Sequence, residues 1–144
     1  MDMPKGDAVD RPVIGTGNTA RTWRAVVGLA LAYLTVSVVA LAVTALLRDD
    51  PAVATTAAWV REVVVALSAC VTVALARRSA AGSPRALLRL RLVTAIMVVA
   101  IVVVISVPGV FPVWLRAEQA VCGVLLLGIV LLVNGPTLRR AVRR

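Results

Sequence analysis

The chain of 144 residues has no histidine, two cysteines and few aromatic residues, namely one Phe, one Tyr and three Trp. Soluble domains depend on aromatic rings for much of their core packing, so this scarcity is unusual for a chain of this length. The cysteines, Cys70 and Cys122, form no CxxC motif and have no histidine to join them as metal ligands. A disulfide-rich secreted scaffold is therefore excluded, and neither a zinc site nor a thiol redox centre has support.

The composition is dominated by apolar residues instead. Hydrophobic residues make up 60% of the chain and charged residues 16%, whereas soluble domains have about 45–50% and about 25%. The excess is Val, Leu and Ala, and it is gathered into long runs. This composition excludes an ordinary cytosolic enzyme and a disordered protein, and it predicts a polytopic membrane protein.

Four apolar segments are long enough to cross a bilayer. The clearest, Ala25–Leu47, has 23 residues without a charge and would be roughly 35 Å long as a helix, against a hydrocarbon core of ~30 Å. Residues 93–107 are rich in Val and Ile, which favour strands in water. In lipid an isolated strand leaves its backbone unpaired, so we expect a helix there as well.

We therefore expect an all-α fold of four transmembrane helices, arranged as two antiparallel hairpins. The predicted helices cover residues 24–47, 55–77, 87–107 and 112–134. Together they form a transmembrane domain over residues 21–138. Residues 1–20, which are polar and rich in Gly and Pro, are expected to form a disordered cytoplasmic tail, and residues 139–144 a basic cytoplasmic tail.

The charges alternate between the predicted loops. With four spans, the side that holds both termini carries thirteen basic and three acidic residues, and the opposite side carries three basic and four acidic residues. Basic residues are retained on the cytoplasmic side, so both termini are expected to be cytoplasmic. The same rule explains the charge of +9 without nucleic-acid binding. The Ala, Val and Arg bias suggests a GC-rich bacterial genome and a bacterial cytoplasmic membrane.

The second and fourth spans share a short pattern near their outer ends. Trp59 precedes Arg61 and Glu62, and Trp114 precedes Arg116 and Glu118. If the hairpins form an internal repeat, these turns lie at similar depth in the membrane. Arg61 is then expected to pair with Glu118 across the bundle, and Arg116 with Glu62. The alternative is that each charge is hydrated separately at the membrane surface. The tryptophans, with Trp23 in the first span, are expected to anchor the helices at the interface.

Two further kinds of contact are predicted. Arginine clusters on the cytoplasmic side are expected to contact anionic lipid headgroups; they are Arg77, Arg78, Arg85, Arg89, Arg139, Arg140, Arg143 and Arg144. Small residues recur at four-residue spacing and are expected to let helices approach closely; they are Ala66, Cys70 and Ala74, Ser68, Thr72 and Ala76, and Gly28 and Ala32. Ala120 and Gly128 are expected to lie on one face of the fourth span for the same purpose. Hydroxyls within the spans are expected to bond to the carbonyl one turn back or to a neighbouring helix.

No span has an ionisable residue near its centre, so the sequence assigns no catalytic, cofactor-binding or metal-binding residue. The leading interpretation is a non-enzymatic structural or interaction subunit, which packs with itself or with an unidentified membrane partner. A small channel or transporter formed by oligomerisation is the alternative. An enzyme would have to use Glu62 and Glu118 as its acid and base, and convergence of these carboxylates to ~5–9 Å would favour that reading.

Overall fold

The computed structural model describes residues 14–109 and 111–142, and these residues are almost entirely helical. The described helices are α1 (Ile14–Leu46), α2 (Thr56–Ala80), α3 (Pro84–Ser106), α4 (Val113–Asn134) and α5 (Pro136–Val142). Four of the helices in this part of the chain are long and apolar enough to cross a membrane. The protein is thus an all-α bundle, as the sequence predicts.

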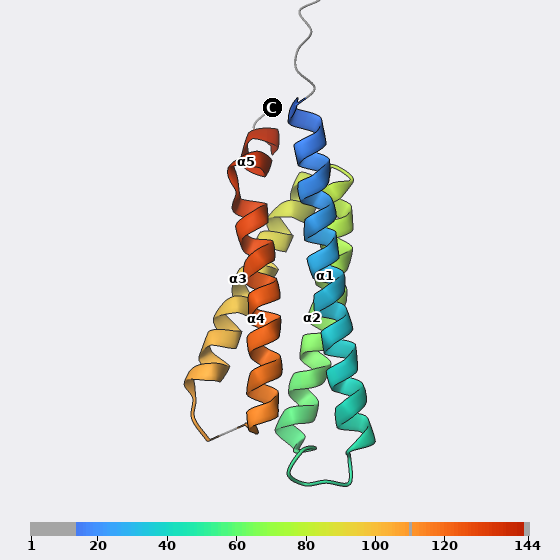
Figure 1. Ribbon diagram of the computed structural model, residues 1–144, viewed down its shortest axis with the longest axis vertical. Coiled ribbons are helices and arrows are strands. Elements are labelled where there is room, and N and C mark those ends of the chain that lie inside the picture. The colour runs from blue at the N-terminus through green and yellow to red at the C-terminus, as the bar shows by residue number, and fades with distance from the viewer. Residues whose placement is uncertain (1–13, 110, 143–144) are drawn as a thin grey trace, which may run out of the picture.

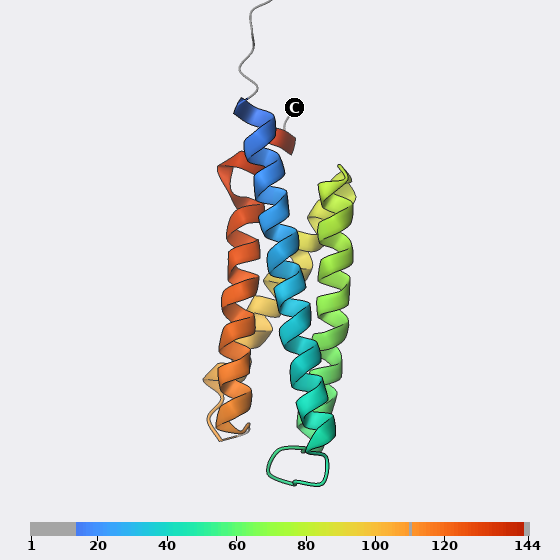
Figure 2. The same ribbon diagram turned by 45° about the vertical axis from the view of Figure 1, so that its right-hand side comes forward.

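The four long helices form a closed ring in which each packs against two others. Helix α1 contacts α2 and α4, and α3 contacts the same two helices. Successive helices run antiparallel, so α2 and α4 are parallel and stand on one diagonal of the bundle (Figure 1, Figure 2). The short helix α5 folds back against α1 and α4. As a result, the described ends of the chain, at Ile14 and Val142, lie at the same end of the bundle (Figure 1).

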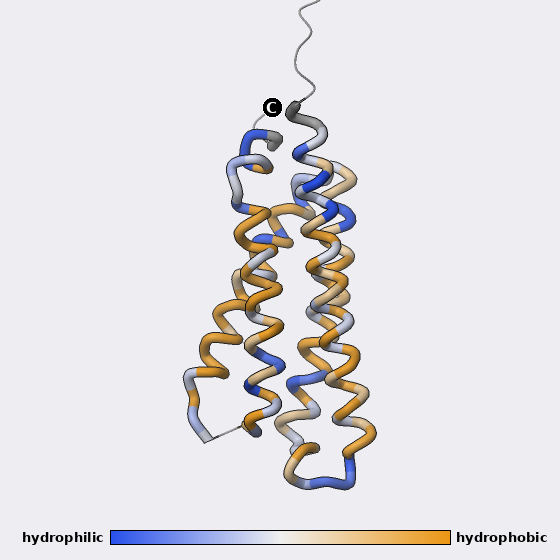
Figure 3. The backbone as a smooth tube through the Cα atoms, in the orientation of Figure 1, coloured by the Kyte–Doolittle hydropathy of each residue, from blue (hydrophilic) through white to orange (hydrophobic). Residues whose placement is uncertain are grey.

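That end, which we call the arginine-rich end, also contains the α2–α3 turn. Its charged residues within the described ranges are all arginines; they are Arg21, Arg24, Arg77, Arg78, Arg85, Arg89, Arg91, Arg139 and Arg140. The opposite end contains the α1–α2 and α3–α4 loops, with Asp49 and Asp50 in the first of them. Figure 3 shows the polar ends and the apolar middle that separates them.

Short capping motifs set the helix boundaries. The Thr55 side chain accepts a hydrogen bond from the Ala58 amide at 3.2 Å, and Ser83 caps α3 in the same way, followed by a proline in the first turn. Such caps satisfy amides that lack an intrahelical partner. The tight α2–α3 turn places Gly82 at a φ of 96°, a conformation that costs glycine little because it has no Cβ.

Large apolar side chains cover the outside of the bundle, and many small ones fill its interior. Leu88, Val124 and Leu131 are among many Val and Leu residues that are more than half exposed. Ala30, Ala69 and Ala76 are fully buried, together with larger residues such as Tyr33 and Leu90. In water this surface would be strongly unfavourable. In lipid it is the expected one, because small interior residues allow helices to pack closely and lipid solvates the large ones.

The buried hydroxyls within the helices bond mainly to their own backbone. Ser37, Thr44, Thr72 and Thr94 each donate to the carbonyl four residues earlier, at 2.7–3.0 Å. This confirms the prediction from sequence for these residues, and it leaves few polar groups available along the bundle axis. Ser68 differs, because its buried hydroxyl has no partner among the described residues.

Two boundary predictions need correction. Helix α1 begins at Ile14, so residues 14–20 are helical rather than part of a disordered tail; residues 1–13 lie outside the described ranges. The helix extends well beyond the length that a bilayer requires, because residues before Arg21 can continue it in water. At the other end, residues 136–142 form α5, so a helix occupies most of the predicted basic tail. Leu138 anchors it by being fully buried.

Close packing of α1 against α4 depends on Gly128, because a Cβ built there would lie 3.2 Å from Leu29 Cδ1. We expect Gly128→Leu to lower the free energy of unfolding by about 1–3 kcal/mol through overpacking. Thermal unfolding in one detergent measures the effect. Gly28→Leu is the matched control, since nothing lies within 4 Å of a Cβ at that position. Equal destabilisation by the two substitutions would contradict this description of the interface.

Candidate functional site: a buried charge cluster

The most polar group of buried side chains lies between α2 and α4, near their N-terminal ends. Arg61 and Glu118 are each the sixth residue of their helix, which places them about 8 Å along the axis from the helix start. Because the two helices are parallel, these residues lie at similar depth.

The guanidinium group of Arg61 joins two carboxylates. Its Nη1 and Nη2 atoms donate to Glu118 Oε2 at 3.1 and 3.2 Å, and Nη1 also donates to Glu62 Oε1. The three side chains are enclosed, with exposed fractions of 9% for Arg61, 0% for Glu62 and 10% for Glu118. We refer to Arg61, Glu62 and Glu118 as the charge cluster. It connects α2 and α4, which stand on a diagonal of the ring.

Neighbouring polar groups extend the charge cluster toward α1. Cys122 lies one turn beyond Glu118, and its Sγ donates to Glu118 Oε1 at 3.6 Å. Tyr33, on α1, is fully buried, and its hydroxyl has no hydrogen-bond partner among the described residues. Glu62 Oε2 and Gln119 Oε1 are buried without a hydrogen-bond partner among the described residues. Three of the four long helices thus contribute polar atoms to one enclosed region.

The energetics of the charge cluster depend on Arg61. Removing charges from water is costly, and a buried ion is tolerated mainly when an opposite charge and hydrogen bonds compensate it. One guanidinium group compensates two carboxylates here, so each carboxylate relies on the same partner. Loss of Arg61 would leave both without one, whereas loss of Glu118 would leave the pair of Arg61 and Glu62.

The structure brings together three of the four residues in the predicted cluster. Arg61 reaches Glu118 across the bundle, as expected from the repeat. It also bonds to Glu62, its neighbour in sequence, because a long guanidinium side chain can turn back along the helix. The expected pairing of Arg116 with Glu62 is wrong. Arg116 instead donates from Nη2 to the backbone carbonyl of Ile105, at 3.1 Å.

This contact of Arg116 is one of two that clamp the α3–α4 hairpin. Ile105 is in the last turn of α3, where carbonyls have no intrahelical donor. At the arginine-rich end, Arg91 of α3 donates to the carbonyl of Val133 in the last turn of α4, at 3.1 Å. Each helix therefore supplies a cation to the negative C-terminal end of the other. Arg91 could not be predicted as a capping residue from the sequence, because its contact depends on which face of α3 meets α4.

The remaining predicted contact residues lie close to helix ends. Trp59 and Trp114 are in the first turns of α2 and α4, and Trp23 is on α1 at the arginine-rich end. Their role as interface anchors, and that of the arginines as lipid contacts, stays a prediction. Arg77, Arg78, Arg85, Arg89, Arg139 and Arg140 are exposed at that end, while Arg143 and Arg144 lie outside the described residues. Within the described ranges no three His, Cys, Asp or Glu residues are grouped as a metal site would require.

Comparisons with protein-family models, curated proteins and solved structures find no match for the chain. The fold and the charge cluster nevertheless define a class. Four long apolar helices with polar ends, an exterior of Val and Leu, and charges enclosed within the bundle are the features of a small multi-pass integral membrane protein.

Replacing Arg61 should be the most damaging change in the charge cluster. We expect Arg61→Gln to cost about 3–5 kcal/mol in unfolding free energy, because it leaves two buried carboxylates uncompensated. Glu118→Gln should cost less, since Arg61 keeps Glu62 and the amide can still accept a hydrogen bond. The triple variant with Gln at 61, 62 and 118 should recover part of the loss. Unfolding in mixed detergent micelles measures all three.

Arg48→Gln is the matched control, because Arg48 is exposed and meets Asp49 only at 4.0 Å; such pairs contribute little to stability. If Arg61→Gln were as mild as this control, the charge cluster would have no structural role. If the triple variant were less stable than Arg61→Gln, uncompensated charge would not be the cause of the loss.

The two clamping arginines predict reciprocal effects on helix ends. Arg116→Gln should increase amide hydrogen exchange in the last turn of α3 and leave the last turn of α4 unchanged, because only the Ile105 carbonyl loses its donor. Arg91→Gln should do the opposite. Peptide-level exchange in detergent measures both, so each variant controls for the other. Equal changes at both ends in either variant would contradict the capping role.

Proposed function

We propose that the protein is a non-enzymatic interaction subunit of a membrane, and that it assembles with a second copy of itself through one face of α2. The observation that carries this proposal is a row of small residues, Ala66, Cys70 and Ala74, on the outside of the bundle. Cys70 and Ala74 are exposed and Ala66 is half-buried. Residues four apart lie on one face of a helix, and small residues there allow a second helix to approach closely.

Two of the other rows of small residues differ from this one because they take part in contacts within the bundle. On the same helix, Thr72 and Ala76 are buried within the bundle, and Gly128 of α4 packs against Leu29. These rows are already used by contacts within one chain. The row of Ala66, Cys70 and Ala74 contributes least to the fold of the single bundle, and this supports a contact between chains.

The interior favours a structural role over transport. Along the middle of the bundle the buried residues are apolar, including Val73, Leu126 and Ile129. The buried hydroxyls nearby bond to their own helices, which leaves few groups to replace the hydration shell of a solute. A channel or transporter formed by oligomerisation, the alternative, would therefore need its path between subunits rather than through one bundle.

The convergence of Glu62 and Glu118 raises the question of catalysis. A catalytic acid and base need access to a substrate or to water. These carboxylates share Arg61 and are largely enclosed, which supports a structural role for the charge cluster. We infer that it fixes the docking of the two hairpins.

We also propose that the arginine-rich end faces the cytoplasm, in the cytoplasmic membrane of a bacterium. The positive-inside rule supports this orientation, because the described residues of that end include arginines and no acids, while Asp49 and Asp50 lie at the opposite end. In this orientation the anionic lipids of the inner leaflet would meet the exposed arginines.

The two native cysteines allow a direct test of self-association. Two copies in one membrane share their orientation, so a symmetric contact through α2 places Cys70 beside Cys70 of the second copy. We expect mild oxidation of native membranes to give a disulfide-linked dimer. Cys70→Ala should abolish it. Cys122→Ala should leave it intact, because Cys122 is only 1% exposed.

A cysteine elsewhere on the surface controls for random collision. In the Cys70→Ala variant, Val64→Cys on α2 or Leu127→Cys on α4 places a thiol at another exposed position. These variants should give little dimer, and none when the protein is diluted with added lipid before the oxidation. Equal cross-linking from all three positions, or cross-linking only from Leu127→Cys, would contradict the α2 contact.

A further inference from the structure

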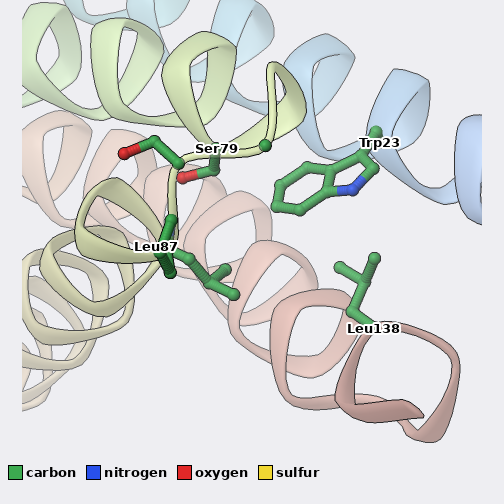
Figure 4. Close-up of a pocket in the computed structure, with 7 residues that line it drawn as sticks. Trp23, Ser79, Leu87 and Leu138 are labelled. Atoms are coloured by element: carbon green, nitrogen blue, oxygen red, sulfur yellow. The ribbon is translucent and has the colours of Figure 1, made fainter. Parts of the chain in front are cut away.

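A pocket of about 320 Å³ opens at the arginine-rich end of the bundle. Its walls come from elements far apart in the sequence, namely Trp23 of α1, the α2–α3 turn, Leu87 of α3 and Leu138 of α5. Figure 4 shows the indole ring of Trp23 between Ser79 and Leu138, with Leu87 on another side of the pocket. The pocket therefore combines apolar walls with a hydroxyl group.

The hydroxyl of Ser79 is unlike most other buried hydroxyls of the protein. Ser79 is 4% exposed, and its Oγ has no hydrogen-bond partner among the described residues. Ser37, Thr44 and Thr94 satisfy theirs on the carbonyl one turn back. A buried hydroxyl without a partner is destabilising, so its presence on a pocket wall points to a ligand that accepts a hydrogen bond there.

The electrostatic surroundings indicate that this acceptor is an anion. Four of the residues that line the pocket are each next in the chain to an exposed arginine; these arginines are Arg24, Arg78, Arg85 and Arg139. The described acidic residues lie elsewhere, in the α1–α2 loop and in the charge cluster. Like charges gathered at one end repel one another, and a bound anion offsets that repulsion.

The backbone adds to this preference. Helix α3 begins at Pro84, on the pocket wall, and a helix N-terminus attracts anions. The C-terminal end of α2 is also near, but three of its last four carbonyls are already occupied. Those of Arg77, Arg78 and Ser79 accept hydrogen bonds from the amides of the turn at 3.0–3.2 Å. Because these carbonyls are occupied, the negative end of α2 repels an anion less, and it does not cancel the attraction of the α3 N-terminus.

We propose that this pocket binds the headgroup of an anionic phospholipid. The phosphate accepts a hydrogen bond from Ser79 at the end of the bundle that carries the four exposed arginines, and the glycerol and upper acyl chains pack against Trp23, Leu87 and Leu138. A free phosphate has the same charge but no apolar part to fill these walls. The pocket lies at the arginine-rich end of the bundle, where the headgroups of a bilayer leaflet would lie beside it.

Trp23 provides the probe. In a variant with Trp59→Phe and Trp114→Phe, the remaining indole emission reports on the pocket. The detergent-solubilised protein is titrated with short-chain phosphatidylglycerol, with phosphatidylcholine of equal chain length, and with inorganic phosphate. We expect a saturable change with phosphatidylglycerol, at least tenfold weaker binding of phosphatidylcholine, and little response to inorganic phosphate. Saturation by inorganic phosphate in the same concentration range would overturn the assignment to a lipid.

Substitutions distinguish specific binding of the lipid in the pocket from nonspecific adsorption to a basic surface. Ser79→Ala should weaken binding of phosphatidylglycerol about fivefold, the effect of losing one hydrogen bond, and Ser79→Leu, which fills the pocket, should abolish it. Ser106→Ala is the matched control, because Ser106 is exposed at the opposite end and bonds to Val102; it should have no effect. Arg85→Gln should weaken binding more than Arg48→Gln.

Thermal unfolding of each variant in lipid-free detergent shows whether it is folded, and Ser79→Ala alone is sufficient if Ser79→Leu fails to fold. Unchanged affinity in Ser79→Ala, combined with an equal loss from any arginine at that end, would mean adsorption of the headgroup to a basic surface and would overturn the pocket assignment. Neither result depends on whether Cys70 forms a dimer, so this proposal and the proposed assembly fail independently.

Discussion

The backbone hydrogen bond governs this structure more than any side chain does. In hydrocarbon an unpaired amide or carbonyl has no water to replace its partner, so each apolar segment must satisfy its backbone internally and becomes a helix. Short turns with Thr55, Ser83 and Gly82 then reverse the chain where the apolar runs end. Hydrocarbon as the solvent also reverses the arrangement found in soluble proteins, in which large apolar side chains lie inside. Large Val and Leu side chains face outward, and alanines lie among the residues at the helix contacts.

Buried polar side chains also need hydrogen-bond partners within the protein, and this explains their arrangement. Most buried hydroxyls return to their own helix, and Arg91 and Arg116 bond to carbonyls at the ends of α4 and α3. The charge cluster satisfies the constraint by compensation, since Arg61 holds both Glu62 and Glu118. Ser79 departs from it, as Ser68 does, with a buried hydroxyl that the described residues leave without a partner, and of these two serines Ser79 lines the pocket. The cluster fits a role in docking the hairpins, whereas Ser79 indicates a ligand.

The architecture could be predicted from the sequence because hydropathy and length determine it almost alone. The four spans and the parallel course of α2 and α4 follow from run lengths and from turn residues. Contacts that depend on helix rotation could not be predicted in this way. Arg116 lies within two residues of Glu118, yet its side chain turns toward Ile105, and Arg91 gave no signal of its contact with Val133. The start of α1 at Ile14 was also missed, because a helix can continue into water beyond its apolar run.

The central claim is that each of the four long helices crosses the bilayer, so that the turns alternate between its two sides. Single cysteines placed in a variant without Cys70 and Cys122 test it, with a membrane-impermeant maleimide added to intact cells. Asp49→Cys and Val113→Cys should be labelled at once, and Ala81→Cys only after the membrane is opened. Labelling of Ala81→Cys in intact cells together with either of the others would contradict the four-span topology.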